Sequence, residues 1–168
     1  MKQNERGPIL TAIIAGLVGA IAIDLYLMVS LTLFFKGTPL LLMQWDASNA
    51  LGAAAYGEGW TAAIVGTLMH FAVSIAWGAL FVAVALRARW LTEHPIASGA
   101  VLGIVAMVVM RAVIHLGHAL IRPFSSFEAF LNNVIAHLVF GVAVALVVAK
   151  RLPDRNKRFV DVAGGVRG

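Results

Sequence analysis

Residues 96–121 read IASGAVLGIVAMVVMRAVIHLGHALI, and this apolar stretch decides the fold. It contains about 26 residues, which at ~1.5 Å of rise per helical residue are enough to cross a bilayer core of roughly 30 Å. The stretch also carries Arg111, His115 and His118. A guanidinium group keeps its charge in proteins, so Arg111 at membrane depth needs an anionic or polar partner. The sequence therefore predicts a membrane helix with a polar centre, and polar partners on other helices.

The composition of the 168-residue chain is too apolar for a soluble domain, with 61% hydrophobic and 12% charged residues and a mean hydropathy of +0.90. A soluble fold of this size cannot bury so much apolar surface. The net charge of +5 lies mostly at the ends of apolar segments, which indicates membrane orientation and not nucleic-acid binding. The absence of cysteine excludes disulfides, thiolate metal sites and Cys nucleophiles.

The apolar pattern predicts an all-α polytopic membrane protein, a four-helix transmembrane bundle that forms a single domain over residues 1–168. The predicted spans are residues 9–35, 60–86, 96–121 and 127–148. Ser125 or Ser126 is suited to cap the fourth span, and Glu128 follows in its first turn. The first loop, residues 36–59, is long for a bundle connection. Its mixture of Leu, Met, Trp and Ala with Gln44, Asp46, Ser48 and Asn49 predicts a short amphipathic helix at the interface or over the bundle mouth.

Lys and Arg residues predict the orientation of the bundle. Two lie in the head before the first span, two in the turn between the second and third spans, and six in residues 149–168. The opposite connections carry only Lys36 and Arg122. The positive-inside rule then places both termini and the basic tail in the cytoplasm. We expect a multi-pass protein of a bacterial inner membrane, with the long first loop outside.

Each predicted span carries an ionisable side chain at a similar depth. Counted inward from the outer ends, Asp24, His70, Arg111 and His137 lie about 10 or 11 residues deep, which is roughly 15–17 Å along a helix. All four therefore fall near the middle of the bilayer. Ionisable residues inside membranes are rare and mark functional sites. The sequence predicts that these four side chains meet at a common height inside the bundle.

The faces of the helices extend this set. Arg111, His115 and His118 are spaced i, i+4, i+7 and form one stripe, and Asn133 shares a face with His137. One interpretation is a buried Asp24–Arg111 ion pair that only fixes helix register, and the other is a carboxylate that accepts protons or positions a ligand. The candidates for ligand binding or a proton relay are Asp24, His70, Arg111, His115, His118, Asn133 and His137.

Several short motifs accompany these residues: Asp24 in the first span, the loop pattern from Gln44 to Ala55, the His70-Phe71 pair, the Pro-Phe-Ser turn at residues 123–125, and His137. In these features the chain resembles a group of small, uncharacterised bacterial four-span inner-membrane proteins. The resemblance covers most of the chain from about Gly16 to Arg151. It implies a four-span architecture and supplies no activity.

Cofactor or metal binding is one class of function that the histidines allow. His70 and His137 lie at one depth on different helices, as bis-imidazole ligation of a b-type haem requires. His115 and His118 offer a second possibility, because either could join His70 or His137 around a transition metal such as copper or zinc. A small ligand held by the same polar residues is a third.

Two further classes stay open. Asp and His inside a membrane can relay protons, so the chain could be a small proton-coupled transporter, for which four helices would need a homodimer. It could also be an accessory or scaffold subunit of a larger membrane complex, in which the polar residues only lock the helix packing. The lipid bilayer is the expected partner in every case. The sequence offers no nucleophile–base pair, phosphate-cradling loop or HExxH motif, so it assigns no enzymatic activity.

Overall fold

The computed structural model describes residues 3–116 and 126–152, which fold into helices without a strand among them. Four of these helices are long and apolar enough to cross a membrane, over Gly7–Phe34, Gly59–Ala85, Pro95–Val113 and Phe127–Arg151. The predicted all-α four-span fold is therefore confirmed, as is the short helix in the first loop. In chain order the elements are α1 (Gln3–Phe34), α2 (Pro39–Leu51), the 3₁₀ turn η1 (Gly52–Tyr56), α3 (Gly59–Ala85), α4 (Trp90–Glu93), α5 (Pro95–Leu116) and α6 (Phe127–Arg151).

The helices extend beyond the apolar segments that predict them. Helix α1 begins at Gln3, so that Pro8 lies inside it, and α6 continues to Arg151. Apolar composition marks the part of a helix that lipid can cover, whereas the helix itself can continue into water. The turn between α3 and α5 contains the one-turn helix α4, which we did not predict. Ser126 caps α6 as expected, because its Oγ accepts a hydrogen bond from the Ala129 N–H at 3.3 Å.

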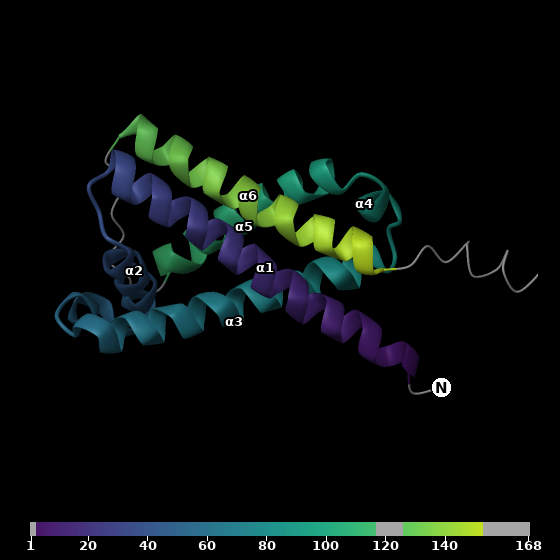
Figure 1. Cartoon of the computed structure of the whole chain (residues 1–168), viewed down its shortest axis with the longest axis horizontal. Helices are drawn as coiled ribbons and strands as arrows, with labels where there is room; N and C mark the ends of the chain where they lie inside the picture. The colour runs from purple at the N-terminus through teal and green to yellow at the C-terminus, as the bar shows by residue number, and fades with distance from the viewer. Residues whose placement is uncertain (1–2, 117–125, 153–168) are drawn as a thin grey trace, which may run out of the picture.

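The long helices pack in the order α3, α1, α6, α5. Helix α1 packs against α3 on one side and α6 on the other, and α6 also packs along α5. Figure 1 shows α1 and α6 side by side, with α3 crossing below them. The N-terminal end of α1, α4 and the C-terminal end of α6 lie at one end of the bundle, and α2 lies at the other. In the described part of the chain, Arg87 and Arg89 beside α4 and Lys150 and Arg151 at the end of α6 therefore share one end of the bundle.

Glycines permit the close contact between α5 and α6. A Cβ atom on Gly103 would overlap the backbone carbonyl of His137, and one on Gly141 would overlap the carbonyl oxygen of Gly99. Small residues at such positions let membrane helices approach backbone to backbone. This contact fixes the position of His137 relative to α5.

Helix α2 folds back onto α3 through a similar contact. Thr38 caps α2, accepting a hydrogen bond from the Leu41 N–H at 3.2 Å, and Pro39 occupies the first turn. A Cβ on Gly66 of α3 would overlap the carbonyl oxygen of Met43 of α2. Helix α2 therefore lies directly on α3, with Leu42, Met43 and Ala47 buried.

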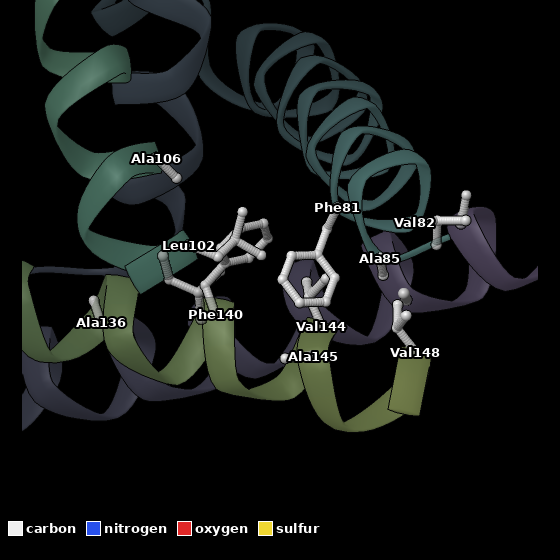
Figure 2. Packing of buried hydrophobic residues seen from close by; sticks show 13 residues of the cluster. Phe81, Val82, Ala85, Leu102, Ala106, Ala136, Phe140, Val144, Ala145 and Val148 are labelled. Carbon is white, nitrogen blue, oxygen red and sulfur yellow. The ribbon is translucent and has the colours of Figure 1, made fainter. Parts of the chain in front are cut away.

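The main apolar core packs α1, α3, α5 and α6 together, and two smaller apolar clusters pack α2 and η1 against α1 and α3. Figure 2 shows Phe81 of α3 beside Val144 of α6, and Phe140 beside Leu102 of α5. These side chains are at most 7% exposed, whereas many large apolar side chains point outward, among them Trp60 at 74%. Such a surface suits lipid and not water, so the protein is an integral membrane protein in contact with the bilayer.

Candidate functional site

A cavity of about 150 Å³ lies in the half of the bundle that α2 covers. Five helices contribute to its walls: α1, α2, α3, α5 and α6. Aromatic and sulfur-containing side chains supply much of the apolar wall, including Trp45, Trp77, Met107, Met110 and Phe140. The polar side chains on the wall are Asp24, Asp46, Asn49, His70, Ser74, Arg111, Asn133 and His137. The structure thus brings Asp24, His70, Arg111, Asn133 and His137 to one cavity.

His70 lies between two carboxylates that come from different helices. Its Nε2 is 3.2 Å from Oδ1 of Asp24 on α1, and its Nδ1 is 3.6 Å from Oδ2 of Asp46 on α2. The His70 and Asp24 side chains are 17% and 11% exposed, and that of Asp46 is 33% exposed. The three groups therefore form a short series from the cavity mouth, where Asp46 lies, to the buried Asp24.

The Nε2 atom of His70 is completely shielded from solvent, yet it makes no hydrogen bond of acceptable geometry within the described part of the chain. The 3.2 Å approach to Asp24 gives electrostatic attraction without a well-aligned N–H···O bond. A buried polar atom without a hydrogen bond is costly and is rare in folded proteins. A proton between this atom and the Asp24 carboxylate is therefore favoured.

Asp46 is the titratable group of the site that lies outside the four candidate spans. Burial raises the pKa of Asp46 to about 6, His70 opposes the rise, and the negative charge of Asp24 adds to it. This carboxyl group therefore changes its charge close to neutral pH. That range makes Asp46 suitable for exchanging protons with the medium.

The raised pKa of Asp46 predicts a pH-dependent stability. An unfolded Asp has a pKa of about 3.9, so the contribution of this group to stability is complete below about pH 4 and is lost as the pH rises through 6. Asp46→Asn, which stays neutral, is expected to raise the thermal midpoint by a few degrees more at pH 7.5 than at pH 4. Circular dichroism in mild detergent measures this. Glu93→Gln, at an exposed side chain beside Arg89, serves as the control. If Asp46→Asn shifted the thermal midpoint equally at both pH values, the raised pKa of Asp46 would be contradicted.

The structure gives Asp24 a contact with His70, whereas the sequence suggested Arg111 as its partner. Arg111 lines the same cavity from α5, and its pairing with Asp24 stays a prediction. On the opposite side of α1, the Tyr26 hydroxyl donates a hydrogen bond to Oδ1 of Asn132 on α6 at 2.8 Å. This bond lies two residues from Asp24 and fixes the rotation of α1 relative to α6.

On α6, Nδ1 of His137 is 2.9 Å from the carbonyl oxygen of Asn133, one turn earlier in the helix. Because a carbonyl oxygen can only accept, Nδ1 donates in this bond, which leaves Nε2 for other partners. His137 and Asn133 both line the cavity, as their shared face predicts. His118 and the His115 side chain lie outside the described residues, so their predicted contributions stay predictions.

The metal and haem predictions find no support in the described residues. No group of three or more His, Asp or Glu side chains in residues 7–113 and 126–152 is arranged to hold a metal ion. Asp24 and Asp46 approach opposite nitrogens of His70, and the lone pairs of those nitrogens diverge, so the three groups cannot share one ion. The cavity of about 150 Å³ is also smaller than the ~300–1,000 Å³ of pockets for drug-sized ligands.

The site residues predicted from the sequence did not include Asp46 or Trp45, which both line the cavity. Asp46 and Asn49 are spaced i, i+3 on the predicted loop helix, so a shared polar face was the available signal. The spacing does not tell whether that face points toward the bundle or toward solvent. In the structure, Asp46 and Asn49 line the cavity.

Comparisons with known proteins leave the site to be interpreted from its geometry. A scan against protein-family models found no match, and neither did searches of curated proteins and of solved structures.

Proposed function

We propose that this integral membrane protein binds a small polar ligand in the cavity beneath α2, and that binding is coupled to the protonation of Asp24, His70 and Asp46. The observation that carries the proposal is the convergence of these three side chains from three helices on one cavity. The buried, unbonded Nε2 of His70 gives a second reason, because a proton between it and Asp24 is favoured and links this pair to the charge of the cavity.

A purely structural role for the polar residues accounts less well for this arrangement. A scaffold is expected to satisfy its buried polar atoms and to fill its interior, because voids and unpaired groups cost stability. Here the cavity collects polar side chains from five helices, and Asp46 comes from a loop helix that is not needed to span the membrane. A ligand site therefore fits the geometry better than an accessory subunit does.

Fluorescence of the cavity tryptophans tests the proposal. Trp45 and Trp77 line the cavity, whereas Trp60 and Trp90 are 74% and 50% exposed, so a Trp60→Phe/Trp90→Phe background reports on the site. We expect the tryptophan fluorescence to change saturably with at least one of methylammonium, acetate or glycerol. We also expect the midpoint of its pH titration to shift by about one unit or more in His70→Gln.

Glu93→Gln is the control for this experiment, because its side chain lies outside the cavity lining and is 53% exposed. It should leave both the ligand response and the pH titration unchanged. If none of the three probes gives a saturable response, or if His70→Gln titrates like the parent protein, the proposal is wrong.

We also propose that the α2 end of the bundle faces outward and that both termini lie in the cytoplasm of a bacterial cell. The uneven distribution of Lys and Arg supports this orientation. Because the chain has no cysteine, single cysteines introduced at Tyr56 and Arg87 are clean probes. An impermeant thiol reagent added to intact cells should label the first and not the second, and the reverse result would invert the orientation.

A further inference from the structure

The balance of charge in the cavity bears on the chemical class of its ligand. The charged and titratable groups that line it are Asp24 from α1, Asp46 from α2, His70 from α3, Arg111 from α5 and His137 from α6. With both histidines neutral and both carboxylates ionised, these described residues sum to one negative charge. An uncompensated negative charge on side chains that are only 11% and 33% exposed is costly, so these described residues favour one additional positive charge.

A proton can supply this charge. Protonated His70 would face a carboxylate from each of its nitrogens, at 3.2 Å and 3.6 Å. Protonation of a carboxyl group would balance the charge equally well. In either case the ligand-free site carries one proton beyond the state in which both carboxylates are ionised and both histidines are neutral.

A cationic ligand can supply the same charge. The cavity combines its two carboxylates with the aromatic side chains of Trp45, Trp77 and Phe140. The faces of aromatic rings attract ammonium groups. An anion would have to approach two carboxylates, and a neutral ligand would leave the charge-balancing proton in place instead of replacing it. The small cavity volume limits the cation to a compact one.

We propose that the ligand is a small organic monocation of the alkylammonium type, and that its binding displaces one proton from the Asp24–His70–Asp46 group. This inference rests on the proposed function and goes beyond it by fixing the charge of the ligand and the number of protons exchanged. The exchange is balanced: one cation enters, one proton leaves to the solvent, and the charge of the cavity stays at zero. Alternate occupancy by a proton and a cation is the property that a proton-coupled cation exchanger requires.

Isothermal titration calorimetry of the full chain in lipid nanodiscs tests the stoichiometry. Methylammonium and tetramethylammonium chloride are the probes, and buffers of different ionisation enthalpy report the protons released. We expect saturable binding of at least one probe with release of one proton where the site is protonated. As the pH falls below that protonation midpoint, the apparent Kd of the cation should rise about tenfold for each pH unit, because one proton competes with one cation.

Two variants make the test specific. Asp24→Asn removes one negative charge, so it is expected to abolish the proton release and to weaken cation binding at least tenfold. Glu93→Gln, at the far end of the bundle beside Arg89, should bind as the parent protein does. If Asp24→Asn failed to fold, His70→Gln offers a second measurement: it should still bind the cation and release a proton, but with a protonation midpoint displaced by about one pH unit or more.

Each other outcome has a definite meaning. Saturable binding of sodium acetate without ammonium binding would overturn the ligand class and leave the proposed ligand site intact. Binding of sodium ions in place of the ammonium probes would overturn the organic-cation assignment. Cation binding with no proton release would overturn the exchange. Absence of saturable binding for every probe, including glycerol, would overturn both this inference and the proposed function.

Discussion

Gly103→Ala is expected to destabilise the protein by about 1–3 kcal/mol, which is the usual cost of an overpacked interior. The added Cβ would overlap the backbone carbonyl of His137, and a backbone cannot move aside as a flexible side chain can. Helices α5 and α6 would have to separate, although they form the most extensive helix contact in the bundle. The midpoint of thermal unfolding in mild detergent, followed by circular dichroism, measures the effect.

Gly7→Ala is the matched control for this substitution. Gly7 also lies in a helix, α1, but nothing lies within 4 Å of the position that its Cβ would take. Replacing this glycine should be neutral or stabilising by up to about 1 kcal/mol, because alanine favours the helix. Equal midpoints for Gly103→Ala and Gly7→Ala would show that α5 and α6 are not packed backbone to backbone.

The second large effect is expected from separating Asp24 from His70. Replacing His70 with leucine leaves the Asp24 carboxylate, which is 11% exposed, without its contact to the imidazole. Removing one member of such a buried pair is strongly destabilising, whereas replacing both with apolar residues is often tolerated. We therefore expect the Asp24→Leu/His70→Leu double variant to be more stable than the sum of the two single changes predicts.

A double-mutant cycle measures this coupling, which should amount to about 0.5–3 kcal/mol. The same cycle with Arg111→Leu in place of His70→Leu tests the pairing that the sequence suggested. A larger coupling between Asp24 and Arg111 than between Asp24 and His70 would identify the guanidinium as the main partner. Additive effects in the first cycle would contradict the role of the Asp24–His70 contact.

The depth of the polar residues could be inferred from the sequence, but their contacts could not. Depth follows from counting residues along helices of known rise, so Asp24, His70 and His137 could be assigned to one level without any tertiary information. A contact also depends on how far each helix is rotated about its axis. That rotation is set by distant residues, for example by the hydrogen bond between Tyr26 and Asn132.

Asp46 shows most clearly what lay beyond the sequence. Its place in a polar loop helix was evident, but the sequence did not decide whether that helix lies at the interface or over the bundle mouth. The return depends on Gly66 of α3, whose missing side chain admits the carbonyl of Met43. Asp46 thereby reaches His70 over a separation of 24 residues in the sequence, as their 3.6 Å contact shows.

The sequence by itself determined that this protein is a four-span membrane bundle, because hydrophobicity and helical rise act locally along the chain, and it predicts ionisable groups at mid-depth. Only the tertiary structure decided which of these groups face one another and that a loop carboxylate joins them. Those contacts depend on where backbones approach closely, and glycines permit that approach: Gly16 and Gly78 between α1 and α3, Gly66 beneath α2, and Gly103 and Gly141 between α5 and α6.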